Sequence, residues 1–300
     1  MSTADDVVAE PAQDEAVIYE VTASGVAVLT LNRPDRLNTW GGDIANAFYT
    51  GLDRAEEDPA VRVIVLTGRG KAFCAGAQLG SMGSVAEAIA NTDEGKLASL
   101  VGDRQPYHLT TLCKPVVAAI NGSCVGIGLT QALMCDVRFA AAGAKFAASF
   151  SRRGLIAEYG VSWILPRLTG WGVALDLLLS GRTFLADEAA DLGLVKEVVP
   201  PERLMQRAME YAEDIAQHCS PASMAIIKRQ TYGDAMREVV QASSRAEVLL
   251  HESLQRPDVI EGITSFLDKR APSFPGLSAS TIATTDSCGT GKDDHGEPGL

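Results

Sequence analysis

Two uninterrupted apolar runs constrain the fold of this chain more than any other feature. Residues 61–67 read VRVIVLT and residues 114–120 read KPVVAAI, so apolar side chains occupy neighbouring positions instead of every second one. A strand buried on both faces has this pattern, and sheets covered by helices are built from such strands. The sequence therefore predicts a sheet inside the molecule.

Further strands and helices alternate along the chain. Residues 17–22 and 26–31 read as two strands, and residues 42–58 show apolar residues at helical spacing. We expect a loop over 68–82, mostly helix over 84–101, and a helix from 184 that Gly193 ends before a last strand. Repeated strand and helix units predict an α/β fold with right-handed crossovers.

The ends of the chain differ in composition from its centre. Residues from 275 onward are rich in Ser, Thr, Gly and Asp, with few large apolar residues to offset the entropy lost on ordering. Over the whole sequence, 46% of the residues are hydrophobic, which is enough for a sizeable core between the two ends. We expect a flexible acidic arm at 1–15, a core at 16–200, a helical region at 201–274 and a disordered tail at 275–300.

Charge and cysteine usage exclude several functions. The net charge of −12 disfavours a nucleic-acid surface, which needs clustered Lys and Arg. The six cysteines form no CxxC pair, so neither a zinc site nor a thioredoxin-like motif is expected. No secretory, mitochondrial or peroxisomal signal is recognisable, and no apolar run is long enough to span a membrane. We expect a cytoplasmic protein without a metal or a membrane partner.

Gly126-x-Gly128 lies between a predicted strand and a predicted helix. The third glycine and the acidic residue of a dinucleotide-binding fingerprint are missing, and residues 68–73 lack the spacing of a phosphate-binding loop. A bare backbone opening a helix exposes N–H groups, which can bind an anion or a developing oxyanion. Alternatively, the glycines only allow close packing.

A second loop with small residues, FCAGAQL at 73–79, also follows a buried strand. Two N–H donors from separate loops are what an oxyanion hole requires, although a plain surface turn also explains this loop. Glu158 is one carboxylate within the mostly apolar stretch 154–160, where burial would raise its pKa and suit it to proton transfer. A solvated loop position is its alternative role.

Several long stretches, in order, resemble the crotonase superfamily, which includes the enoyl-CoA hydratases and isomerases. They are LNRPDRLNTW, VRVIVLTGRGKAFCAGAQLGSM, KPVVAAINGSCVGIGLTQALMCDVRFAA, GRTFLADEAADLGLVKEVV and DVIEGITSFLDKRAPSF. The resemblance covers about residues 15 to 274. It implies a spiral of repeated ββα units with a helical C-terminal trimerisation region, assembled as a homotrimer or as a hexamer of paired trimers.

The resemblance also implies acyl-CoA substrates and assigns residues to them. The two oxyanion donors fall on the main chain of Ala77 and Ile127. CoA is carried as part of the substrate, and no separate cofactor is implied. The CoA contacts fall on the following residues: Arg36, Leu37, Asn38, Ala75, Gln78, Leu79, Phe266 and Lys269.

Departures from the family pattern concern the reaction. Hydratases of this family use two glutamates, and Thr130 and Phe150 occupy the corresponding positions here. Gln78 also replaces an aspartate common in relatives. The stretch RRGLIAEYGVSW is similar to members of the 3-enoyl-CoA isomerase type, whose single catalytic Glu falls on Glu158. Isomerase chemistry is therefore favoured; hydration, another crotonase reaction such as thioester hydrolysis or decarboxylation, and a catalytically silent acyl-CoA binder are the alternatives.

Overall fold

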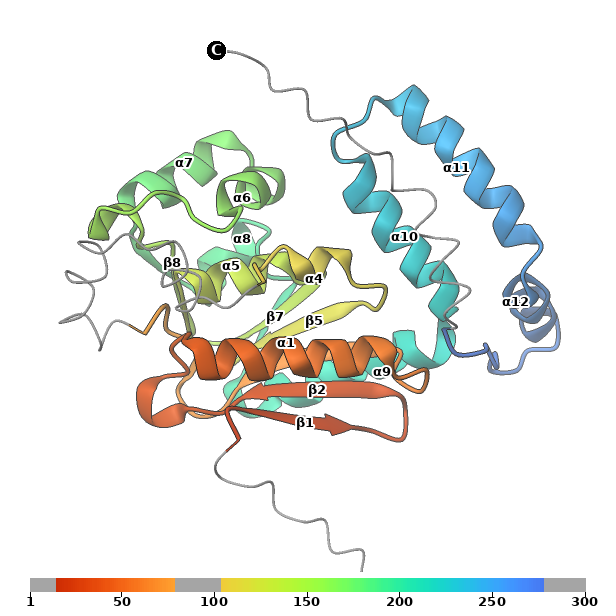
Figure 1. Ribbon diagram of the computed structural model, residues 1–300, viewed down its shortest axis with the longest axis horizontal. Helices are drawn as coiled ribbons and strands as arrows, with labels where there is room; N and C mark the ends of the chain where they lie inside the picture. Colours follow the sequence, from red (N-terminus) through yellow and green to blue (C-terminus); the bar gives the residue numbers. More distant parts are fainter. Residues whose placement is uncertain (1–14, 79–103, 278–300) are drawn as a thin grey trace, which may run out of the picture.

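The structure is a computed structural model that describes residues 15–78 and 104–277 (Figure 1). The predicted helix at 84–101 and Leu79 lie outside the described residues. So do the expected acidic arm, except residue 15, and the expected tail beyond residue 277. Within the described part, Leu277 is buried against Cys113, Ala222 and Ala225, so the packed chain continues at least to that residue.

A six-stranded sheet forms the centre of the molecule, with strand order β1-β2-β3-β5-β7-β10. The first two strands are antiparallel and every other neighbouring pair is parallel. Both predicted apolar runs are central strands of this sheet, as expected. The strands are β1 (Val17–Val21), β2 (Val26–Leu31), β3 (Val63–Gly68), β5 (Val116–Ile120), β7 (Val137–Ala141) and β10 (Glu197–Val199).

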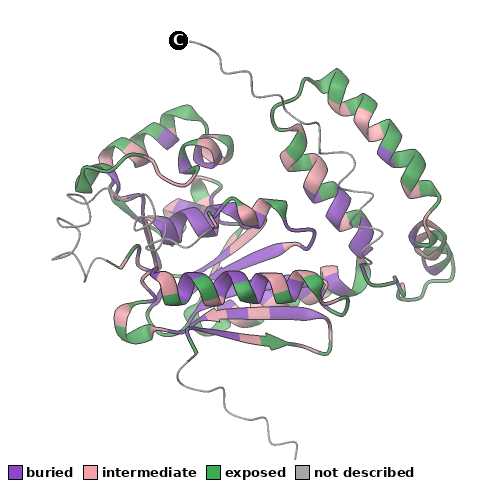
Figure 2. Ribbon diagram, in the orientation of Figure 1, coloured by how far each residue is buried: buried purple, intermediate pink, exposed green. Residues whose placement is uncertain are grey.

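Alternate residues of the central strands enter two different cores. Ile64 and Leu66 of β3 pack on the side of α1 (Gly42–Glu57) and α5 (Ile127–Met134), whereas Val63 and Val65 pack against α9 (Leu204–His218). This two-sided burial is why the run carries no polar alternation. The purple sheet between helices in Figure 2 shows the same layering.

A second sheet of four short strands lies beside the first, in the order β4-β6-β8-β9. Its members are β4 (Ala72–Cys74), β6 (Ser123–Val125), β8 (Lys145–Ala147) and β9 (Thr183–Leu185). The expectation of a loop throughout 68–82 was therefore wrong at β4. The helix expected from 184 is present as α8 (Ala186–Asp191), before Gly193 and the last strand β10, but residues 184 and 185 belong to β9. Strands of three residues are too short to show a side-chain period, and they form here by pairing with one another.

Each main-sheet strand β3, β5 and β7 is followed by a strand of the small sheet, β4, β6 and β8 respectively. This repeat, with its helices, is the predicted crotonase-type spiral, and the α/β fold class is confirmed. In the described residues the remaining helices are α4 (His108–Thr111), α6 (Val161–Thr169), α7 (Trp171–Ser180), α8 (Ala186–Asp191), α10 (Pro221–Asp234), α11 (Val239–Leu254) and α12 (Pro257–Leu267). Single 3-10 turns are η1 (Pro34–Arg36), η2 (Ser151–Arg153) and η3 (Pro201–Arg203).

The C-terminal helices α10 to α12 extend from one side of the core, opposite α6 and α7 (Figure 1). Much of α11 and α12 is exposed, including large apolar residues (Figure 2). None of the helices in the described ranges is long and apolar enough to cross a membrane.

Candidate active site

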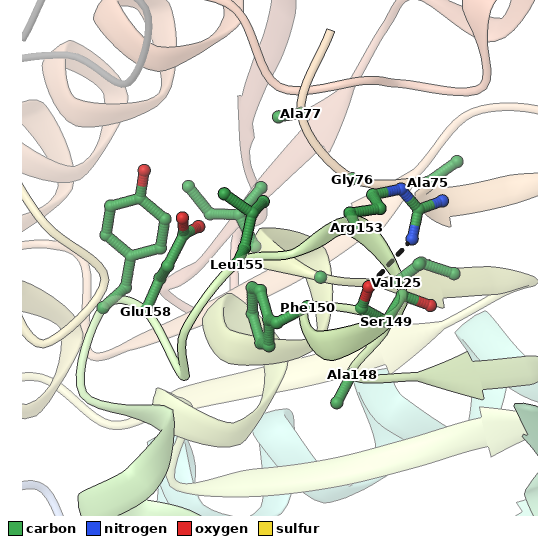
Figure 3. Close-up of a pocket in the computed structure, with 13 residues that line it drawn as sticks. Ala75, Gly76, Ala77, Val125, Ala148, Ser149, Phe150, Arg153, Leu155 and Glu158 are labelled. Atoms are coloured by element: carbon green, nitrogen blue, oxygen red, sulfur yellow. Dashed lines mark hydrogen bonds between the residues drawn. The ribbon is translucent and has the colours of Figure 1, made fainter. Parts of the chain in front are cut away.

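A pocket opens where the end of β4, the turn between β6 and α5, and the segment 148–159 meet (Figure 3). We call it the Glu158 pocket, because Glu158 is its one carboxylate among the described residues. Most of its wall is apolar or made of small residues. It is lined by Ala75, Gly76, Ala77, Val125, Gly126, Ile127, Ala148, Ser149, Phe150, Arg153, Leu155, Glu158 and Tyr159.

Pairing between β4 and β6 brings the two glycine turns together. Cys74 aligns with Cys124 in this parallel pair, and each strand then enters its turn. Gly76 has φ +106 and Gly126 has φ +55, values that L residues rarely adopt. A Cβ atom on Gly126 would lie 3.9 Å from the Gly76 Cα, so the turns face one another closely.

The turns leave the N–H groups of Ala77 and Ile127 without an acceptor among the described residues. Neighbouring bonds hold the first turn: Trp40 N donates to Gly76 O (2.7 Å) and Gln78 N donates to Trp40 O (2.8 Å). Ile127 is the first residue of α5, so its N–H has no partner within the helix and carries part of the helix's positive dipole end. Both residues line the Glu158 pocket, where their N–H groups could bind an oxyanion.

Gly128 has a different role from Gly126. A Cβ atom on Gly128 would approach the Cys74 carbonyl oxygen to 2.3 Å and the Cys74 Cβ to 2.7 Å. The missing side chain therefore lets α5 pack directly on β4. Close packing, one of the two explanations for the glycine pair, therefore applies to Gly128. Gly126 instead has a backbone conformation (φ +55, ψ −120) that sets the turn before the Ile127 N–H.

Glu158 is half-buried in the pocket wall, just before α6. Its carboxylate has no hydrogen bond or ion pair with any residue that the structure describes. Burial raises the pKa of this carboxyl above its ordinary value of 4.5. The neighbouring Tyr159, in a left-handed backbone conformation (φ +56), has its pKa raised to about 12 by burial and, less, by Glu158.

Of the two positions that correspond to the hydratase glutamates, one lies in the Glu158 pocket and the other does not. Phe150 is buried and lines the Glu158 pocket. Thr130 is fully buried within α5, where its hydroxyl donates to Gly126 O at 3.3 Å, and it does not line the pocket. The described walls of the pocket therefore supply one carboxylate for proton transfer.

The predicted CoA contacts near the N-terminal half lie close to one another. Arg36 Nη1 donates to Gln78 Oε1 at 3.1 Å, and Arg36 Nη2 donates to Asp43 Oδ2. Leu37 is exposed and Ala75 lines the Glu158 pocket. These four predicted residues therefore lie on two segments, 36–37 and 75–78, that hydrogen bonds join.

Asn38 has a structural function in the same region. Its side chain is fully buried: Nδ2 donates to Arg69 O (3.0 Å) and Ala72 O (2.7 Å), and Oδ1 accepts from Arg33 N (2.8 Å). These main-chain partners fix the approach to β4 and enclose the amide away from solvent.

Phe266 and Lys269 are not brought to the Glu158 pocket within one chain. Phe266 is 81% exposed at the end of α12, and Lys269 follows it. Figure 1 shows α12 on the side of the molecule away from α6 and α7. The pocket segment 148–159 connects β8 to α6 and so belongs to that other side. The single chain therefore gathers only part of the predicted site.

Several residues of the pocket wall were missed in the sequence, among them two polar residues, Arg153 and Ser149. Arg153 lines it and Ser149, with φ +57, has a strained backbone at its edge. The doubled arginine before Gly154 was the available signal, but it does not tell which arginine enters the pocket. Among the described residues, no group of His, Cys, Asp and Glu could hold a metal ion.

Comparisons with known proteins agree with this architecture. Residues 21–277 match the family model described as enoyl-CoA hydratase/isomerase. The chain is 34% identical over 257 residues to the 1,2-epoxyphenylacetyl-CoA isomerase of Escherichia coli K12, covering 84% of this chain and 95% of that protein. It is 36% identical over 260 residues to a putative enoyl-CoA hydratase of Thermus thermophilus, covering 86% and 100% respectively.

Solved structures show the same fold. An enoyl-CoA hydratase from Mycobacterium marinum is 67% identical and aligns with a TM-score of 0.63, over 74% of this chain and 100% of that one. A probable enoyl-CoA hydratase/isomerase from Mycobacterium abscessus is 33% identical with a TM-score of 0.77, over 87% and 99%. The fold, the paired glycine turns and these matches together show that the chain belongs to the enoyl-CoA hydratase/isomerase family of the crotonase superfamily.

Proposed function

We propose that the protein isomerises the double bond of an enoyl-CoA thioester, with Glu158 as the base. The observation that carries this proposal is one carboxylate without a partner among the described residues, in the same pocket as two N–H groups without a described acceptor. A double-bond shift needs one group that takes a proton and returns it, together with a site for negative charge.

The thioester oxygen accepts hydrogen bonds from Ala77 N–H and Ile127 N–H. Glu158 removes a proton from the α-carbon, and the electron pair moves into a dienolate whose charge rests on that oxygen. The protonated Glu158 then delivers the same proton to the γ-carbon, which forms the 2-enoyl thioester. The proton count is balanced with one carboxyl group. Each oxyanion donor is worth roughly 10²–10³ in kcat.

Hydration is the second candidate, because relatives named as hydratases are among the most similar proteins. Adding water requires a base for the water and an acid for the α-carbon. Phe150 and Thr130 supply neither, so hydration would depend on Glu158 alone.

Separate incubations with a 3-enoyl-CoA and a 2-enoyl-CoA distinguish the reactions. We expect the 3-enoyl-CoA to gain the ultraviolet absorbance of a conjugated thioester, and little loss of that absorbance from the 2-enoyl-CoA. Fast loss from the 2-enoyl-CoA, with 3-hydroxyacyl-CoA formed, would establish hydration instead. Binding of both thioesters without turnover of either one would identify a silent acyl-CoA binder. Hydration of the 2-enoyl-CoA or binding without turnover would each contradict the proposal.

The raised pKa of Glu158 predicts the pH dependence of this reaction. The base acts only when ionised, so activity should fall as pH drops through the pKa of Glu158 in the folded protein. Because burial raises this pKa, the acid limb of kcat/KM should lie above 4.5. A pH profile of kcat/KM measures it, and an acid limb at or below the ordinary Glu value would contradict the assignment.

For assembly, we propose a homotrimer or a hexamer of two trimers, which would place α12 of one copy against another. The motivation is the exposed apolar surface of the last two helices, including Val239 (78% exposed) and Phe266 (81%). Sedimentation should give a mass of three or six chains, and Val239→Asp should shift it toward smaller species. Val21→Asp, on the distant β1, is the matched control. A monomeric wild type would refute this proposal.

A further inference from the structure

Arg153 is the one cation among the described residues that line the Glu158 pocket. Its Nη1 donates to the main-chain oxygen of Ser149 at 3.1 Å. Within the described part of the chain, no carboxylate pairs with its guanidinium, and its Nε and Nη2 atoms have no protein acceptor. Burial is the only cause of the raised Glu158 pKa, so Arg153 does not act as the partner of that carboxylate.

The local backbone holds Arg153 in this place. Ser149 is not a glycine, yet it adopts φ +57, and its carbonyl is the one that binds the guanidinium. Strained conformations of this kind gather at ligand sites. The adjacent Arg152 is directed elsewhere, because its Nε donates to Ser180 O at 2.7 Å.

Arg153 and Glu158 occupy different ends of the pocket. Figure 3 shows Leu155 between them, with Arg153 beside Ala75, which follows β4, and Glu158 on the other side. A base therefore lies at one end and a positive charge at the other, with apolar residues between. Arg153 is exposed to solvent, so the donors that its bond to Ser149 leaves unused are accessible to a planar, two-oxygen group, which arginine binds with paired hydrogen bonds.

We propose that Arg153 forms an anion subsite that binds a carboxylate or phosphate group carried by the thioester itself. This subsite rests on the proposed function, because it takes the ligand of the Glu158 pocket to be an acyl-CoA. Two parts of such a ligand can supply the group, namely a carboxylate at the far end of the acyl chain or a phosphate of CoA. Their shared chemistry is an anionic pair of oxygens within reach of the pocket.

Equilibrium binding of three unreactive probes separates these sources. The probes are hexanoyl-CoA, adipoyl-CoA, which adds a terminal carboxylate, and S-hexanoylpantetheine, which lacks the nucleotide phosphates. Titration calorimetry with wild type, Arg153→Gln and Arg153→Lys gives the affinities. Arg152→Gln is the matched control, because its side chain bonds outside the pocket.

We expect Arg153→Gln to weaken binding of at least one anionic probe by roughly 10–100-fold, as losing a charged hydrogen bond does. Arg153→Lys should recover part of it, and Arg152→Gln should stay within about twofold of wild type. Weakening of both CoA esters but not of S-hexanoylpantetheine assigns the group to a CoA phosphate. Weakening confined to adipoyl-CoA assigns it to an acyl carboxylate.

Unchanged affinity for all three probes would overturn the subsite. Equal weakening of all three, including the probe without an anion, would also overturn it, because Arg153 would then act through shape alone. These readouts need no turnover. If the protein proves not to be an isomerase, the binding series still tests Arg153, and a failed subsite leaves the Glu158 chemistry untouched.

Discussion

Glu158→Gln should lower kcat for 3-enoyl-CoA isomerisation by roughly 10²–10⁴-fold, the usual contribution of a positioned base. The amide keeps the shape of the side chain and cannot accept the α-proton. Affinity for unreactive hexanoyl-CoA should change little, since no described contact of the carboxylate holds the pocket together. Initial rates of conjugation and titration calorimetry on the same preparations measure the two effects.

The same substitution should raise the free energy of unfolding at neutral pH. The folded-state pKa of Glu158 is raised, so its ionised form is disfavoured in the folded protein. Its contribution to stability is complete below the unfolded pKa and is lost as pH rises through the folded pKa. Removing the charge should therefore raise Tm at pH 7 and leave it nearly unchanged at low pH.

Glu202→Gln is the matched control, because Glu202 is an exposed residue of η3. It should change neither kcat nor Tm appreciably. A Glu158→Gln protein that retains isomerase activity within about tenfold of wild type would remove Glu158 from the proposed chemistry. Strong hydration that survives the substitution would do the same.

Gly126→Ala should cost roughly 10²–10³-fold in kcat, the price of one displaced oxyanion donor. Gly126 has φ +55 and ψ −120, a conformation that L residues avoid. Space is not the obstacle, because an added Cβ would lie 3.9 Å from Gly76 Cα and 4.0 Å from Ala148 O. The turn should therefore relax and move the Ile127 N–H away from the thioester oxygen.

Gly143→Ala separates this effect from a general loss of stability. Gly143 also has a positive φ, +81, and a Cβ there would meet nothing within 4 Å. It lies in the turn between β7 and β8, outside the Glu158 pocket. Both variants should lose on the order of 1 kcal/mol of stability, and only Gly126→Ala should lose kcat. Equal kinetic losses in the two proteins would exclude a special role for the Ile127 turn.

The main sheet could be predicted because the apolar pattern of its central strands indicates, from the sequence alone, that both faces are buried. The uninterrupted runs of β3 and β5 are buried on both faces, and the apolar stripe of α9 packs on the sheet. The second sheet could not be predicted in this way. A strand of three residues such as β6 shows no period, and it exists because β4 and β8 lie beside it.

In the candidate site, too, some residues could be predicted from the sequence and others could not. Glu158 and the two glycine turns could be chosen from local chemistry and from the family resemblance. Arg152 and Arg153 are indistinguishable in the sequence, and only the strained turn at Ser149 directs one of them into the pocket.

The sequence alone determined the family, the buried strands and the residue types available for proton transfer, because each depends on local pattern or on a motif. The tertiary structure decided which of these meet. Pairing of β4 with β6 places Gly76 against Gly126, although 50 residues separate them along the chain. The packing of the C-terminal helices leaves Phe266 near the end of α12, away from the pocket. Proximity of this kind depends on strand pairing and helix packing across the whole chain, which no local pattern encodes.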